Sequence, residues 1–339
     1  MDERDFVEIN RSYPGGTQAY CRETIPRIAR NDPYVTQIHI DNILEQGHET
    51  AVSFAKALRG NTNVKVVCFG INHNDVFDLI LSALTETQVE EIGIWPLAGT
   101  LPTRSERAVC ANYYATKIAK TINFIPKVRK LVLSRCMIGP NTAMSLADNI
   151  AENKTLLHID LSDNAIGDDG AAAFAHALLK NNTLKELSLD NNQISTQGQI
   201  ALRNSIFDTS SFDALENCNH TLQSFFNGSP RNVFGKAVMN DCFHSLAANL
   251  RSKTRKEAIT MKIHRCLQKK YKVKLQHQSF SCMQSGVMPH LLAFISQRCV
   301  VATMYDIIRG FPNLLEMDQC NKSGNDELND KLGTLKIED

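Results

Sequence analysis

The sequence lacks long apolar runs, paired cysteines and an excess of either charge. No run reaches the roughly 18–20 apolar residues that a membrane span requires, and the opening residues (MDERDFVEIN) are charged where a secretory signal would be apolar. The ten cysteines include no C-x-x-C pair, which favours a reduced cytoplasmic or nuclear protein over a disulfide scaffold. With 37 basic and 36 acidic residues, the chain as a whole is not expected to bind nucleic acid through its net charge.

Recognisable catalytic motifs are also missing. The sequence contains no G-x-S-x-G and no H-E-x-x-H, and its ten histidines do not cluster at the spacing of metal ligands. Residues 228–237 (GSPRNVFGKA) depart from a phosphate-binding loop, because six residues separate the glycines and alanine replaces the metal-binding hydroxyl. We therefore expect no cofactor, no bound metal and no enzymatic activity.

What the sequence does contain is a repeat of 28 residues. The pattern V-x-x-L-x-L-x-x-C-x-I, which begins at Val128, recurs in closely related form from Leu156 and from Leu184, with asparagine at the cysteine position. Its alternation of apolar and polar residues predicts a strand. In the second half of the repeat, apolar residues recur at i, i+3, i+4 and i+7 from Ala143 and again from Ala171, which predicts a helix with one buried face.

Weaker copies extend the repeat in both directions. The first residues of these copies are Val35, Val64, Val89 and, for a worn seventh copy, Phe212. About eleven extra residues are inserted within 99–123. The predicted repeat region is therefore 34–220, preceded over 1–33 by an N-terminal cap that covers the apolar face of the first repeat.

These motifs resemble the leucine-rich-repeat family, and in particular its ribonuclease-inhibitor type, which has one strand and one helix in each 28-residue repeat. The resemblance implies an α/β solenoid of about seven repeats, with a curved parallel sheet inside and helices outside. The physics points the same way, because a single strand–helix copy cannot bury both of its apolar faces unless copies stack. Asparagine after the strand, at Asn72, Asn164 and Asn192, is expected to bond backbone groups that the ending strand leaves unpaired.

Beyond the repeats, the period stops and helical patterns return. Residues 221–320 are predicted to be helical, and the polar tail 321–339 is predicted to be disordered. Two stretches in this region, MPHLLAFI and VATMYDIIRGFPNLLE, resemble the helical tail of a repeat family that is expanded in diatoms and related algae.

A basic segment at residues 251–274 carries ten lysines and arginines and a single acid, Glu257. Its charge is therefore +9, which leaves −8 on the rest of the chain. Ile259 and Ile263 align on one helical face, so the segment is both basic and amphipathic. Its partner could be nucleic acid or an anionic membrane, an acidic surface of another protein, or the acidic face of this same chain. A solvated helix packed on the last repeat is the alternative.

Strand residues at the polar positions must point away from the helices, which makes the inner, concave face the candidate protein-binding surface. The residues that we assign to it are Trp95, Lys130, His158, Asp160, Glu186, Asp190 and Glu216. In the last three repeats acids outnumber bases by four to none, which favours a basic partner. Trp95 would act as an aromatic anchor or would pack against Tyr113 and Tyr114. A solvated face without a partner is the plain alternative.

The predicted function is a non-enzymatic scaffold that binds an unidentified protein. The alternative is GTPase activation, because Ran-activating proteins are built from similar repeats, and Arg135 after the fourth strand is its only candidate residue. Asp168 and Asp169 resemble a metal loop, but their place in the repeat predicts that they cap a helix. The N-x-T triplets at Asn153 and Asn181 fit a repeated turn better than glycosylation.

Overall fold

The computed structural model describes residues 16–40, 48–70, 77–95, 104–210, 212–225 and 236–268. Several subjects of the sequence predictions lie outside the described residues: residues 1–15 of the N-terminal cap, Asn72, most of the loop 228–237, residues 269–274 of the basic segment, MPHLLAFI, VATMYDIIRGFPNLLE and the tail 321–339. No helix within the described ranges combines the length and the apolar character that crossing a membrane would require.

The chain divides into two compact units. Met1–Ile206 and Thr221–Leu250 form the first, which we call the sheet-bearing unit. Phe207–His220 and Arg251–Asp339 form the second, which we call the C-terminal unit. Phe207–His220, which the sequence pattern placed among the repeats, therefore groups with the chain after Leu250.

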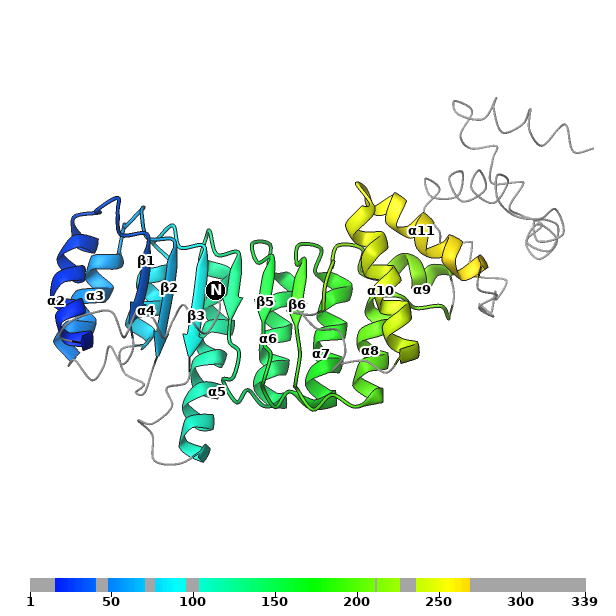
Figure 1. The fold of residues 1–339 in the computed structure, drawn as a ribbon, viewed down its shortest axis with the longest axis horizontal. Coiled ribbons are helices and arrows are strands. Elements are labelled where there is room, and N and C mark those ends of the chain that lie inside the picture. The colour runs from blue at the N-terminus through cyan, green and yellow to red at the C-terminus, as the bar shows by residue number, and fades with distance from the viewer. Residues whose placement is uncertain are drawn as a thin grey trace, which may run out of the picture. The chain divides into compact units, whose positions relative to one another are not determined.

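Six strands build one parallel sheet, in which each strand lies beside the next one in sequence (Figure 1). They are β1 (Gln37–Ile40), β2 (Val66–Gly70), β3 (Glu91–Trp95), β4 (Lys130–Val132), β5 (His158–Asp160) and β6 (Glu186–Ser188). The register pairs equivalent positions of successive repeats, such as Leu131 with Ile159 and Ile159 with Leu187. The predicted α/β architecture with parallel strands is confirmed.

A helix follows each strand and returns the chain to the start of the next one. The helices of the sheet-bearing unit are α2 (Gly16–Ala29), α3 (His48–Leu58), α4 (Phe77–Leu84), α5 (Arg104–Thr121), η1 (a 3-10 helix, Ile122–Phe124), α6 (Pro140–Glu152), α7 (Gly167–Lys180), α8 (Thr196–Ile206) and α10 (Lys236–Arg251). Neighbouring helices pack in sequence order, α6 on α7 and α7 on α8. The repeat that carries the insertion predicted within 99–123 has the 18-residue helix α5, which is longer than the 13 and 14 residues of α6 and α7.

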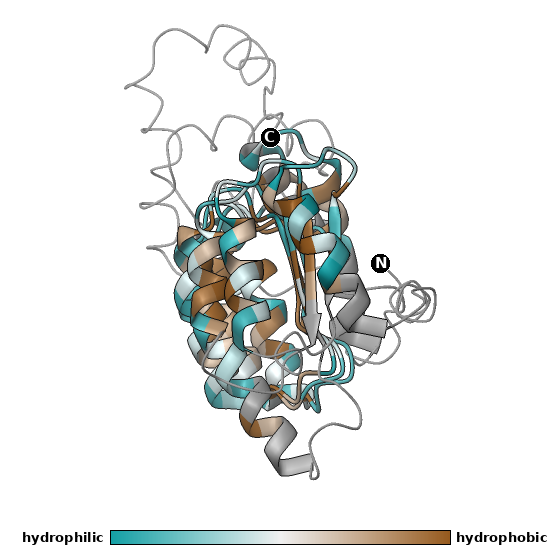
Figure 2. Cartoon of the chain, turned by 90° about the vertical axis from the view of Figure 1, so that its left-hand side faces the viewer, coloured by the Kyte–Doolittle hydropathy of each residue, from teal (hydrophilic) through white to brown (hydrophobic). Residues whose placement is uncertain are grey.

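The core lies between the sheet and these helices. Leu131 and Ile159 from the strands and Phe174 from α7 are fully buried, and Figure 2 shows hydrophobic residues along the strands and on the helical surfaces beside them. Strands contribute alternate residues to this core because successive side chains point to opposite faces of a sheet. Gly170 lets α7 approach α6 closely, since a Cβ atom there would lie 2.9 Å from Cβ of Ala143.

The predicted seventh strand at Phe212 is wrong. Phe212–Asn217 form a short helix, α9, which belongs to the C-terminal unit. The spacing of three residues between Phe212 and Leu215 suits one turn of a helix as well as the start of a repeat. Leu215 is buried within this helix.

Pairing with the sheet resumes farther along the chain. The Leu187 N–H donates to the carbonyl of Ser224 at 3.0 Å, and Ser224 forms an isolated parallel bridge with Glu186. The repeat therefore restarts near Leu222, which lies 38 residues after Leu184 instead of the expected 28. The ten additional residues accommodate α9.

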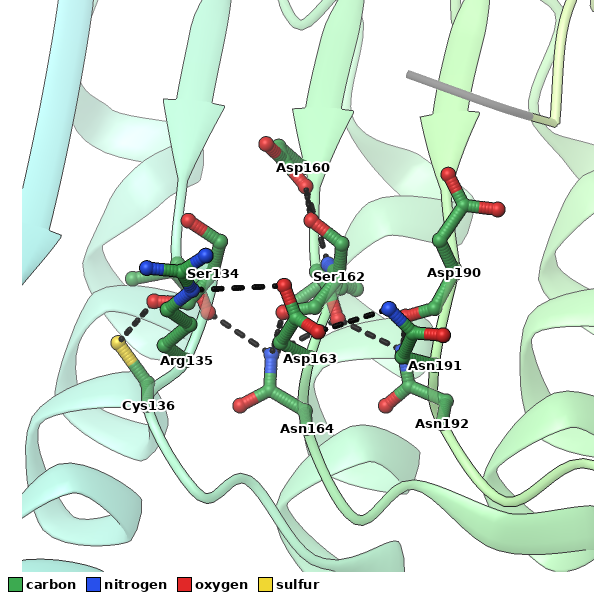
Figure 3. A network of polar contacts seen from close by, with 12 residues as sticks. Ser134, Arg135, Cys136, Asp160, Ser162, Asp163, Asn164, Asp190, Asn191 and Asn192 are labelled. Carbon is green, nitrogen blue, oxygen red and sulfur yellow. Dashed lines mark hydrogen bonds and ion pairs between the residues drawn. The ribbon is translucent and has the colours of Figure 1, made fainter. Parts of the chain in front are cut away.

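One row of side-chain amides closes the repeats where the strands end. Figure 3 shows Asn164, whose Nδ2 donates to the carbonyl of Leu133 at 2.9 Å. Its Oδ1 accepts from the Ile138 N–H at 3.0 Å. Both partners belong to the preceding repeat. Asn192 does the same one repeat later, with Nδ2 donating to the carbonyl of Leu161 at 2.8 Å. These asparagines fill the predicted role and also join adjacent repeats.

Cys136 occupies the equivalent position in the fourth repeat. Its Sγ donates to the carbonyl of Ile94 at 3.4 Å, so a buried thiol takes part of the amide's role. Burial raises the pKa of this thiol, which keeps it protonated and able to donate.

A second row of asparagines closes the opposite end of the repeats, where each helix gives way to a strand. Asn181 is only 2% exposed. Its Nδ2 donates to the carbonyls of Ile150 and Asn153 at 2.7 and 3.0 Å. Its Oδ1 accepts from the N–H groups of Thr183 and Leu184 at 2.9 and 2.8 Å. Asn153 and Asn181 begin two of the N-x-T triplets, so burial and bonding of their amides explain those triplets structurally.

Replacing Asn181 with alanine is expected to lower the free energy of unfolding by about 2–3 kcal/mol, because it leaves buried carbonyl and N–H groups of two repeats unbonded. The measurement is urea unfolding followed by circular dichroism. The matched control is Asn182→Ala, since Asn182 is the next residue and is exposed; its effect should stay within about 0.5 kcal/mol. Equal effects of the two variants would contradict the proposed role of the buried amide.

Candidate protein-binding face

The concave face consists of the strand residues that point away from the repeat helices. Because the strands pair in register, these residues form rows that cross the sheet. The first row is Gln37, Val66, Glu91, Lys130, His158 and Glu186. The second row includes Cys68, Gly93, Val132, Asp160 and Ser188. The structure thus brings Lys130, His158 and Glu186 together and places Asp160 in the adjacent row.

Two close side-chain contacts organise the first row. Lys130 Nζ lies 3.0 Å from Glu91 Oε1, and His158 Nδ1 lies 2.9 Å from Glu186 Oε2. The side chains of Lys130, His158 and Glu186 remain between 34% and 52% exposed, so a partner can reach them. Glu91 was not among the predicted binding residues, although its place in the repeat pattern puts it opposite Lys130.

Asp160 is the last residue of β5, and Asp190 follows β6 by two residues; Figure 3 shows the two carboxylates on adjacent repeats. Asp160 Oδ1 accepts from the Ser162 N–H at 3.0 Å and from the Ser162 hydroxyl at 2.5 Å. These bonds hold the Asp160 carboxylate in one orientation. The two carboxylates add negative charge beside the first row.

A chain of side-chain contacts runs along the loops that follow the strands. Arg135 Nε lies 3.5 Å from Asp163 Oδ2, and Asn191 Nδ2 donates to Asp163 Oδ1 at 2.9 Å (Figure 3). All three residues have left-handed backbone conformations, with φ of 59°, 56° and 55°. Asn and Asp tolerate this conformation well. The Arg135 guanidinium, on which the GTPase-activation alternative depends, therefore contacts an acid of the next repeat.

Trp95 and Glu216 were also assigned to the concave face. Trp95 is the last residue of β3, opposite Gly70, and its side chain lies outside what the structure describes, as does its predicted packing with Tyr113 and Tyr114. Glu216 was wrongly assigned to the face, because it lies on α9 instead of a seventh strand and is only 7% exposed. The predicted excess of acids on the face is smaller by this one residue.

Asp168, at the start of α7, caps a different helix from the one expected. Asp168 Oδ1 accepts from the N–H groups of Ser195 and Gly198 at 2.7 and 3.2 Å, and Oδ2 accepts from the Ser195 hydroxyl at 2.5 Å. Ser195 and Gly198 belong to the start of α8, in the next repeat. The prediction that Asp168 caps its own helix was wrong, because the stacked repeat brings the free N–H groups of α8 within reach.

The described part of the basic segment differs from a solvated helix. It forms α11 (Arg255–Gln268), in which Ile259 and Ile263 are buried as predicted. Lys262 is also buried, at 1% exposure, and Arg255 donates to the carbonyl of Glu216 at 2.9 Å. At least these two basic residues therefore act within the C-terminal unit.

No group of three or more His, Cys, Asp or Glu side chains in the described residues is arranged to hold a metal ion. Residues 152–175 and 180–202 match a family model described as a leucine-rich repeat. Together with the parallel sheet and the alternating helices, this match decides the fold. The fold is a leucine-rich-repeat solenoid. No curated protein matches the chain.

Solved structures match the solenoid at low identity. Actin-binding site 2 of leiomodin-1 is 20% identical with a TM-score of 0.27, over 74% of this chain and 94% of that one. The C-terminal domain of tropomodulin from Caenorhabditis elegans is 11% identical with a TM-score of 0.27, over 75% of this chain and 97% of that one.

Replacing Asp168 with alanine should destabilise the solenoid in a pH-dependent way. The Ser195 hydroxyl, followed by the N–H groups of Ser195 and Gly198, lowers the pKa of Asp168 below its usual value. The folded protein therefore gains stability from the carboxylate above the ordinary aspartate pKa of about 4, and loses that gain as the pH falls through the lowered pKa.

The measurement is the melting temperature of the wild type and Asp168→Ala between pH 2.5 and 7. We expect a deficit at pH 7 that shrinks at the acidic end of the range. Asp169→Ala is the matched control, because Asp169 is the adjacent, exposed acid. A deficit that does not depend on pH would contradict the capping role of the Asp168 carboxylate.

Proposed function

We propose that the solenoid is a non-enzymatic scaffold of ribonuclease-inhibitor-like repeats that binds a protein partner on its concave face. The observation that carries this proposal is the in-register row of Glu91, Lys130, His158 and Glu186. Parallel strands lie about 4.8 Å apart, so the row spans about 15 Å. That width matches the 10–12 Å diameter of a helix with its side chains.

Preorganisation supports this assignment. The ion pair Glu91–Lys130 and the contact between His158 and Glu186 restrict side chains that would otherwise lose rotamer freedom on binding. The backbone beneath them is held by parallel pairing on both sides of β4 and β5. A partner that docks on this row therefore meets charges in fixed positions, which favours specificity and a fast association rate.

The charge of the face favours a basic partner. Asp160 and Asp190 place two carboxylates beside the row, and Glu186 adds a third whose neighbour His158 carries charge only when protonated. Arginine and lysine side chains of a partner can form charge-assisted hydrogen bonds with these carboxylates. The basic character of the partner rests on three residues, since Glu216 does not contribute.

GTPase activation is the weaker alternative. An activating arginine must reach the phosphates of a bound nucleotide, whereas Arg135 contacts Asp163 on the adjacent loop. The two functions are separable by a GTP-hydrolysis assay with small GTPases. An acceleration that Arg135→Ala removes would replace the scaffold proposal with this alternative.

Reversing charge on the concave face is expected to abolish partner capture. In the double variant Glu186→Lys and Asp190→Lys, two acids become bases, so a basic partner is repelled where it was attracted. Capture is measured by affinity purification with quantitative mass spectrometry, at matched expression and matched melting temperature. At least a tenfold loss of the enriched proteins is expected, because each lost or reversed charge contact is worth about 1.4 kcal/mol or more.

The matched control reverses two exposed acids on the outer helices, Glu152→Lys on α6 and Asp169→Lys on α7. It makes the same change in net charge and leaves the concave face intact. Undiminished capture by the concave variant, or equal losses in both variants, would remove the concave face from consideration.

A further inference from the structure

A buried lysine and a buried histidine share a hydrogen bond within the C-terminal unit. Lys262 Nζ donates to the carbonyl of Asn219 at 2.8 Å and lies 3.1 Å from His220 Nδ1. His220 precedes the chain's return to the sheet, and Lys262 lies on α11, so the bond connects segments 42 residues apart. Helices α9 and α11 also contact each other directly.

The backbone around His220 fixes the roles of its two ring nitrogens. Nε2 lies 3.0 Å from the carbonyl of Glu216, which can only accept, so Nε2 carries the hydrogen. Nδ1 is then the acceptor for Lys262. This bond is possible whether Lys262 is an ammonium or an amine. In acid Lys262 is an ammonium, which has no lone pair, so the bond fails once Nδ1 also gains a proton and two N–H groups point at each other.

The surroundings oppose a second positive charge at this point. Arg255, which also donates to the carbonyl of Glu216, brings another cation to the same cluster. Burial, followed by the charge of Lys262, lowers the pKa of His220 to about 3. Burial also lowers the pKa of Lys262, to about 7.

Other titratable groups on the same two segments are Glu216, which is 7% exposed, Cys218, Asp208 and Glu257. Burial raises the pKa of the Cys218 thiol to about 11, so it stays neutral in acid. Asp208 contacts Cys218 through its backbone N–H. Glu257, on the first turn of α11, accepts from the backbone N–H of Lys253.

We propose that the hydrogen bond between His220 and Lys262 is an acid-sensitive clasp that holds α11 to residues 216–220, and that protonation of His220 Nδ1 releases the helix. The clasp lies inside the C-terminal unit and acts independently of the concave face. Acid would therefore open this unit while the stacked repeats stay folded.

The sign and size of the effect follow from linkage. The pKa of His220 is lowered in the closed state, so the open state binds the proton more readily. The stability of the clasp is thus fully present above the ordinary histidine pKa of about 6.5 and is lost as the pH falls from 6.5 toward 3. Between pH 7 and pH 5 the opening equilibrium should rise about 25-fold through His220 and only about twofold through Lys262.

Hydrogen exchange of the full chain tests this directly. Protection factors, corrected for the intrinsic effect of pH on exchange, are compared at pH 7 and pH 5 for peptides from α9 and α11 and from α6 and α7. In the wild type, protection of α9 and α11 should fall about 50-fold, the product of the two contributions, with α6 and α7 unchanged. The variant His220→Gln keeps a donor and an acceptor but does not titrate, so its loss should be about twofold.

His176→Gln is the matched control, because His176 is an exposed histidine on α7. It should behave like the wild type. A second measurement needs no variant, since the carbon-13 shift of Lys262 Cε should titrate near pH 7 rather than near 10.5. Unchanged protection in acid, a loss in His220→Gln as large as that in the wild type, or an equal loss in α6 and α7 would each overturn the clasp.

Discussion

The structure depends on satisfying backbone groups at both ends of every repeat. A short strand that runs into a loop leaves carbonyl and N–H groups without partners inside the stack, and each such group is costly when buried. Asn164 and Asn192 supply the missing bonds at one end, and Asn181 supplies them at the other. Because each amide bonds to the preceding repeat, the same contacts that satisfy the backbone also hold neighbouring repeats together.

The concave face inherits its order from this stacking. Equal repeats place equivalent residues side by side, so Lys130, His158 and Glu186 meet although each is 28 residues from the next. The loops show the same effect, since Arg135 and Asn191 both reach Asp163 between them. Lateral contacts of this kind make the surface of a solenoid more rigid than its short strands alone would allow.

The 28-residue period was enough to predict the features that recur in every repeat. It did not predict side-chain contacts between different repeats or between segments outside the repeats. Six strands, their register and the buried helix faces follow from the 28-residue pattern. The Asp168 cap was missed because its partner is one repeat away, and the burial of Lys262 was missed because a lysine on a helix normally faces water. The prediction of a seventh strand at Phe212 was wrong because ten inserted residues move the next repeat along the chain. Phe212 is an apolar residue at the expected spacing, but it lies in a helix.

The origin of the C-terminal unit from two separated segments has a consequence for how the protein is made. Residues 207–220 leave the ribosome before the thirty residues that rejoin the sheet, and α11 follows only after those. Leu215 and Cys218 are buried in the folded protein. During synthesis they stay exposed until α11 has been made. A nascent chain at this stage exposes apolar surface, and such surface is prone to aggregation unless a chaperone covers it.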